Sequence, residues 1–141
     1  FLFGAGFAIA KAFSQTGLAD VTAQSLGVLG ELAPWVILLA VAALITFTTE
    51  ITSNTALVSV MLPVIYAFSV QNHLDPVLFM MVATICASYA FMLPIATPPN
   101  AIVMSSGVIR IKEMALYGLV LNVFGIVLIV LFAHFYWKNL L

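Results

Sequence analysis

Charged residues are scarce in this sequence. Only 6% of its 141 residues are Asp, Glu, Lys or Arg, and the formal net charge is −1. So few cationic side chains form neither the basic surface that binds nucleic acid nor a polybasic patch for lipid headgroups. Hydrophobic residues make up 65% of the chain, and the mean hydropathy is +1.24. This composition predicts an all-α, polytopic protein of the lipid bilayer, with no nucleic-acid partner.

Residues that carry enzyme chemistry are equally few. Cys86 is the single cysteine, which excludes an internal disulfide and a cysteine metal cage, and we expect it to pack as a small apolar residue. The sequence contains no H-E-x-x-H motif and no glycine-rich phosphate loop, and no histidine lies where it would activate Ser53. These absences argue against an enzyme.

One polar stretch, residues 50–56, lies between two apolar runs at 35–47 and 57–70. Neither run reaches the roughly 20 residues that a helix needs to cross a hydrocarbon core of ~30 Å. We therefore predict a re-entrant helical hairpin over 34–72 whose tip lies inside the membrane. Irregular backbone at that depth is tolerated only where protein buries it or a wet cavity receives it, so the tip is a candidate site.

The rest of the chain divides around this hairpin. Residues 1–33 are expected to form a truncated membrane helix and an interfacial amphipathic helix, as in a fragment of a larger transporter. A discontinuous transmembrane helix is expected over 75–109, helical from Pro76 to Leu93 and broken at 94–100. The final span covers 113–138.

A short charged turn, residues 110–113, is expected between the broken helix and the final span. The positive-inside rule places the turn in the cytoplasm and the C-terminus outside.

The two breaks offer complementary chemistry. The first hairpin arm ends at 48–50, and a helix C-terminus carries about half a negative charge and free carbonyls, which suit a small hard cation. The second arm starts at 53–55, where free N–H groups favour an anion. In the second break, the carbonyls of 94–96 end one half-helix, and Thr97 can cap the next, with Pro98 and Pro99 in its first turn.

Neither break has Lys or Arg nearby in sequence. A bound anion must then be balanced by dipoles, hydroxyls and co-bound cations, which predicts cation-coupled anion uptake.

The tripeptide Ser53-Asn54-Thr55, followed by the run Ala96-Thr97-Pro98-Pro99-Asn100-Ala101, resembles the divalent anion/sodium symporter family, and in particular the bacterial sodium-coupled dicarboxylate carriers. The resemblance covers essentially the whole chain but only the C-terminal half of a family member. It implies one inverted-repeat half of an elevator-type transporter with an outward-opening hairpin, a homodimer, and a partner N-terminal half that holds the second SNT motif. Without that half, the chain is not expected to transport.

The resemblance also implies roles for individual residues. Ser53, Asn54 and Thr55 would contact a substrate carboxylate, with Thr97 and Pro98 closing the site. Oxygens of Thr49, Thr52, Asn54 and Ala96 would bind one of two Na⁺ ions. The expected activity is sodium-coupled symport of succinate-like C4 dicarboxylates across a bacterial inner membrane.

Several alternatives stay open at this point. The SNT residues could simply cap a helix, the second break could be a proline kink, and the Thr49 and Thr52 hydroxyls could bond back to their own helix. Glu50 could tune the cation site, or reach water or a partner at the tip. A sodium-independent exchanger, a sulfate carrier, an ion channel and a structural membrane subunit are the alternative functions.

Overall fold

The computed structural model describes residues 8, 11–12, 15–18, 21 and 32–137. Its long helices are α3 (Pro34–Thr49), α4 (Asn54–Gln71), α5 (Pro76–Cys86), α6 (Pro98–Ser105) and α7 (Ile111–Phe135). No strand occurs in this described part, so the all-helical expectation is confirmed there. The two helices expected within 1–33 lie almost entirely outside the described residues.

Local sequence explains where most of these helices begin. The Asp75 carboxylate caps α5 by accepting hydrogen bonds from the Val77 and Leu78 N–H groups at 2.9 and 3.2 Å, and Pro76 occupies the first turn, as the sequence predicted. The Glu113 carboxylate accepts from the Arg110 N–H at 2.9 Å. The helix α7 therefore begins at Ile111, and residues 111–113 form its first turn. The prediction of a separate charged turn over 110–113 was wrong.

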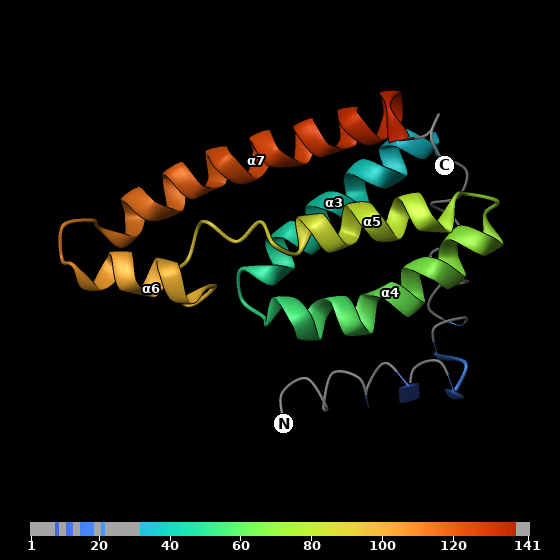
Figure 1. Ribbon diagram of the computed structural model, residues 1–141, viewed down its shortest axis with the longest axis horizontal. Helices are drawn as coiled ribbons and strands as arrows, with labels where there is room; N and C mark the ends of the chain where they lie inside the picture. Colours follow the sequence, from blue (N-terminus) through green and yellow to red (C-terminus); the bar gives the residue numbers. More distant parts are fainter. Residues whose placement is uncertain (1–7, 9–10, 13–14, 19–20, 22–31, 138–141) are drawn as a thin grey trace.

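The α3 helix starts at one end of the molecule, and α4 ends at that same end. The two helices meet at a turn in the middle part of the molecule's long axis (Figure 1). The α5 helix runs back alongside them, and the segment 87–97 carries the chain on to α6, beyond the turn. The α7 helix then returns along almost the whole length. The polar turn between α3 and α4 thus lies beside the end of α5 and the segment that follows it, in the middle part of the molecule's long axis and not at one of its ends.

The helix lengths fit this arrangement. At about 1.5 Å per residue, α3 with its 16 residues is about 24 Å long, and α7 with 25 residues is about 37 Å long. By length and apolar composition, α4 and α7 could each cross a membrane, whereas α3 and α5 are shorter apolar helices. The arm formed by α3 is too short to cross alone, as the sequence predicted, whereas the arm formed by α4, which was predicted to be too short as well, is long enough.

The first half of the broken helix is shorter than expected. The α5 helix ends at Cys86 and not at Leu93, and 87–97 has no regular helix. Pro94 accounts for part of the difference, since its ring clashes with the carbonyl of residue 90 in a continuous helix. The second half is also shorter, because Gly107 adopts a left-handed φ of +71° after Ser105 and ends α6 there.

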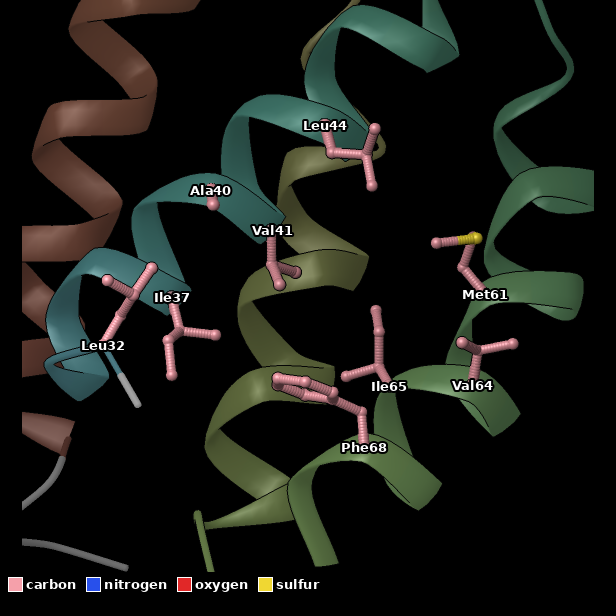
Figure 2. A pocket seen from close by; sticks show the side chains of 9 residues that line it. All are labelled: Leu32, Ile37, Ala40, Val41, Leu44, Met61, Val64, Ile65 and Phe68. Atoms are coloured by element: carbon pink, nitrogen blue, oxygen red, sulfur yellow. The ribbon is translucent and has the colours of Figure 1, made fainter. Parts of the chain in front are cut away.

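The core forms around α5, which packs against α3, α4 and α7. Val82 and Cys86 are fully buried on α5, so Cys86 has the packing role expected of it. Between α3 and α4 lies an apolar cavity of about 110 Å³ (Figure 2). Ile37 and Val41 point into it from α3, and Phe68 does so from α4. Because only hydrophobic side chains line it, this cavity offers no group that would bind an ion.

The helix α7 approaches the irregular segment closely at two glycines. A Cβ atom added to Gly118 would overlap the Phe91 carbonyl oxygen and lie 2.6 Å from Met92 Cα. A Cβ added to Gly125 would lie 2.8 Å from Cε2 of Tyr89, a side chain that can turn away. Backbone packs directly on backbone at Gly118, which therefore tolerates no side chain.

We expect Gly118→Ala to lower the free energy of unfolding by about 1–3 kcal/mol, because the backbone of 91–92 must move to admit the methyl group. The measurement is thermal unfolding of the full-length protein in detergent. Gly125→Ala is the matched control and should cost less. Equal stability of the two variants would contradict backbone contact at Gly118.

Candidate functional site

The turn between α3 and α4 brings two opposite helix ends together. The α3 helix ends at Thr49 and α4 begins at Asn54, as predicted, so carbonyls of one helix and free N–H groups of the other lie at the same place. Ser53 is the N-cap residue of α4, but its side chain makes no capping hydrogen bond. The Ser53 hydroxyl therefore does not cap the helix, which was the alternative role considered for this serine.

Thr49 joins the turn to the second break. Its buried hydroxyl lies 2.6 Å from Asn54 Oδ1 and 2.9 Å from the carbonyl oxygen of Ala87, the first residue after α5. A hydroxyl has one hydrogen and can donate to only one of these two acceptors at a time. Three oxygens therefore converge with a single proton between them, which is a local excess of acceptors that suits a hard cation.

Glu50 forms the second connection between the breaks. Its carboxylate is 3% exposed, and it accepts hydrogen bonds from the Met92 N–H at 2.9 Å and the Leu93 N–H at 3.0 Å. The amide of Asn122 on α7 donates to the same carboxylate at 2.7 Å. Of the alternatives considered for Glu50, contact with water at the tip is wrong, because the irregular segment folds over the carboxylate and donates hydrogen bonds to it.

The N–H groups of 92 and 93 bond to Glu50 and not to carbonyls one turn earlier. Together with Pro94, these bonds explain why no helix continues through residues 92 and 93. Among the described residues, no Lys, Arg or His side chain pairs with Glu50, so its negative charge is balanced only by N–H dipoles.

The second break has its own hydrogen bonds. The Thr97 hydroxyl accepts from the Asn100 N–H at 3.5 Å, with Pro98 in the first turn of α6, as the sequence predicted. The Asn100 side chain donates to the carbonyls of Ala90 and Leu93 at 2.8 and 3.0 Å. Asn100 thus holds the irregular backbone in shape, which a simple proline kink would not require.

The other predicted residues lie around this centre without joining it. The Thr52 hydroxyl bonds back to the Thr48 carbonyl at 2.8 Å, which is the local alternative considered for it. Ser53 and Thr55 are exposed, Ala96 is half-buried, and Pro98 is exposed. Among the described residues, no hydrogen bond links the SNT residues directly to Thr97 or Pro98; the breaks are joined through Thr49 and Glu50.

Sequence reasoning missed three contributors. The Ala87 carbonyl could not be identified, because any residue can present a carbonyl. Asn122 had a signal that went unused: it is the only amide within the apolar run 114–133. Asn100 was part of the motif but had no assigned role.

An all-helical bundle with apolar helices and a buried polar centre at two helix breaks is compatible with an integral membrane protein. The comparisons with known proteins identify its family. The chain belongs to the family described as the sodium:sulfate symporter transmembrane region, whose model matches residues 1–141.

Curated relatives agree with this assignment. The chain is 44% identical over 134 residues to the sodium-dependent dicarboxylate transporter SdcS of Staphylococcus saprophyticus, an alignment that covers 95% of this chain and 26% of that protein. It is 38% identical over 128 residues to the rat Na(+)/dicarboxylate cotransporter 3, covering 91% of the chain and 21% of the relative. Human solute carrier family 13 member 1 is 36% identical over 130 residues, covering 92% and 22%.

The chain thus spans about a quarter of the length of these relatives, which is less than the half that the resemblance led us to expect.

We expect Asn100→Leu to destabilise the protein by about 1–3 kcal/mol, since it leaves the carbonyls of residues 90 and 93 without their donor. Thermal unfolding of the full-length protein in detergent measures this. Ser105→Ala on the same helix, which removes an exposed hydroxyl bonded to the Ile102 carbonyl, should change stability by less than about 0.5 kcal/mol. Equal stability of both variants would exclude a structural role for the Asn100 amide.

Proposed function

We propose that this chain forms part of a sodium-coupled symporter for divalent carboxylates, with succinate-like four-carbon dianions as cargo. The observation that carries the proposal is the convergence of the Thr49 hydroxyl, Asn54 Oδ1 and the Ala87 carbonyl around one proton. The names of two relatives, a sodium-dependent dicarboxylate transporter and a Na(+)/dicarboxylate cotransporter, support sodium as the coupling ion and a dicarboxylate as the cargo.

On the cation side, the proposed Na⁺ ligands are oxygens of Thr49, Asn54 and Ala87, which the structure brings together. Two further proposed ligands, Thr52 and Ala96, follow from the family resemblance. When Na⁺ is present, the Thr49 hydroxyl can turn its hydrogen away and offer its lone pairs. The C-terminal ends of α3 and α5, which both carry partial negative charge, add to the attraction.

On the anion side, the N-terminal end of α4 presents N–H groups and the hydroxyls of Ser53 and Thr55. The N-terminal end of α6 adds the Thr97 hydroxyl but no free N–H group, because its first two residues, Pro98 and Pro99, have none. These donors are proposed to bind one carboxylate of the substrate, with Asn54 and Pro98 completing the site. Because the Ser53 hydroxyl is not used in capping, it is free for this purpose.

Coupling follows from charge. Two opposite unit charges about 6 Å apart attract by about 3 kcal/mol at an effective dielectric constant of ~20, which corresponds to roughly a hundredfold change in affinity. With no cationic side chain in the described breaks, the co-bound Na⁺ supplies this attraction for the anion. By linkage, the anion raises Na⁺ affinity by the same factor.

The arrangement in Figure 1 supports a membrane topology for this part of the protein. We propose that α3 and α4 form a re-entrant hairpin and that α5 and α6 form one interrupted membrane crossing. In this proposal the chain is part of one inverted-repeat half of an elevator-type carrier, since it spans only about a quarter of the length of its relatives. It works with an N-terminal half, in a homodimer, in a bacterial inner membrane, and its C-terminus lies outside.

The first test is uptake of labelled succinate by the full-length protein in proteoliposomes, with an inward Na⁺ gradient or with K⁺ replacing Na⁺ throughout. We expect uptake to require Na⁺, and Thr49→Val to raise the Na⁺ concentration for half-maximal uptake about ten- to a hundredfold, because the cation loses one oxygen ligand. Thr48→Val is the matched control, since this neighbouring hydroxyl bonds only to the Leu44 carbonyl within α3.

Other outcomes assign other functions. Equal uptake in K⁺ that needs internal succinate would make the protein an exchanger, and inhibition by sulfate with no succinate uptake would make it a sulfate carrier. Conductance without saturation would indicate a channel.

A second test addresses the anion side. Ser53→Ala should raise the succinate concentration for half-maximal uptake about fivefold or more while leaving folding intact, because it removes a hydroxyl that makes no helix cap. Ser59→Ala, whose hydroxyl bonds to the Thr55 carbonyl one turn along α4, should leave succinate affinity unchanged. A purely structural subunit predicts the reverse, with losses in assembly and none in affinity.

A further inference from the structure

The buried face of α7 is apolar except at Asn122. This side chain is fully buried, on the same face as Ile126 and Ile129. Its Nδ2 donates to Glu50 Oε1 at 2.7 Å, whereas its Oδ1 is buried without a hydrogen-bond partner. Burying a carbonyl oxygen without a hydrogen-bond partner costs free energy, so the side chain of Asn122 is not explained by a contribution to the stability of the bundle. Its one made bond goes to a carboxylate, and that bond is its evident role.

The contacts around this bond are shared between three elements. Glu50 Oε1 accepts from both Asn122 and the Met92 N–H, and Oε2 accepts from the Leu93 N–H. Without Asn122, Oε1 keeps a single donor, and no group on α7 holds the carboxylate in its position against 92–93. Gly118 lies one turn before Asn122 on the same face and packs on the backbone of 91–92. The helix α7 therefore fixes both the carboxylate and the segment that the carboxylate holds.

The residue next to Glu50 is Thr49, whose hydroxyl bonds to the Ala87 carbonyl in the same irregular segment. A shift of Glu50 relative to 92–93 changes the separation between the end of α3 and that segment. The distances among the three converging oxygens would change with it.

We propose that Asn122 is a positioning residue of the sodium site, which acts through Glu50 to hold the hairpin tip against the second break. This inference rests on the proposed sodium coupling. It makes α7, which contributes none of the proposed ligands, a determinant of cation affinity.

The test is thermal unfolding of the full-length protein in detergent, without substrate, at rising NaCl with KCl added to constant ionic strength. Sodium that binds the folded state raises the unfolding temperature, and the dependence gives an apparent Na⁺ affinity. The variants are Asn122→Leu, Glu50→Gln and the double variant. Asn72→Leu is the matched control, because that amide donates only to the Phe68 carbonyl at the end of α4.

We expect Asn122→Leu to raise the half-maximal Na⁺ concentration about five- to tenfold. If Asn122 acts through Glu50, the double variant should have the same half-maximal Na⁺ concentration as Glu50→Gln alone. Asn72→Leu should leave the half-maximal Na⁺ concentration unchanged.

Two results would overturn the inference: an unchanged Na⁺ dependence in Asn122→Leu, even if its stability in KCl falls, or a double variant whose loss equals the product of the single losses. Should Asn122→Leu fail to fold, Asn122→Ser is judged by the same criteria. A wild-type protein without any Na⁺-dependent increment would instead reject sodium binding itself, and so the proposed function.

Discussion

The structure depends on one buried carboxylate. Glu50 is almost inaccessible, yet it has no cationic partner among the described residues, and three N–H groups from two other elements supply its hydrogen bonds. A buried charge that lacks hydrogen-bond donors or an opposite charge strongly destabilises the fold. Because backbone N–H groups of residues 92 and 93 meet this demand, the helix that would have used them cannot form. The carboxylate therefore holds the second break open as well as in place.

This constraint has an electrostatic consequence. Opening the helix at Ala87 leaves carbonyls of α5 facing the end of α3, where Thr46 and Thr49 bond to the Cys86 and Ala87 carbonyls. Two helix C-termini thus meet on one side of the centre, while the N-terminus of α4 supplies free N–H groups and the N-terminus of α6 supplies the Thr97 hydroxyl. Such a pairing lets a cation and an anion bind together without a charged side chain in either ligand set. It is the physical basis for the coupling that we propose.

Much of this organisation could be predicted from sequence because it has local causes. The Asp75-Pro76 pair started a helix as expected, Pro98 and Pro99 opened another, and the polar run at 50–56 marked the turn. The failures were of a different kind. The end of α5, the partners of Glu50 and the role of Asn122 depend on contacts 38 to 72 residues apart in the chain. No local pattern carries that information.

The sequence by itself determined that the chain belongs in a lipid bilayer, that it is helical, where the first break lies and where α6 begins. It could do so because hydropathy, proline and capping chemistry act within a few residues. Only the tertiary structure decided which groups meet. It chose the Ala87 carbonyl over those predicted at 94–96 to face Thr49, and it turned Glu50 inward. The reason is that a backbone carbonyl or a lone acid becomes part of a site only through neighbours that the fold brings to it, and every residue of the chain has a backbone from which the fold can choose.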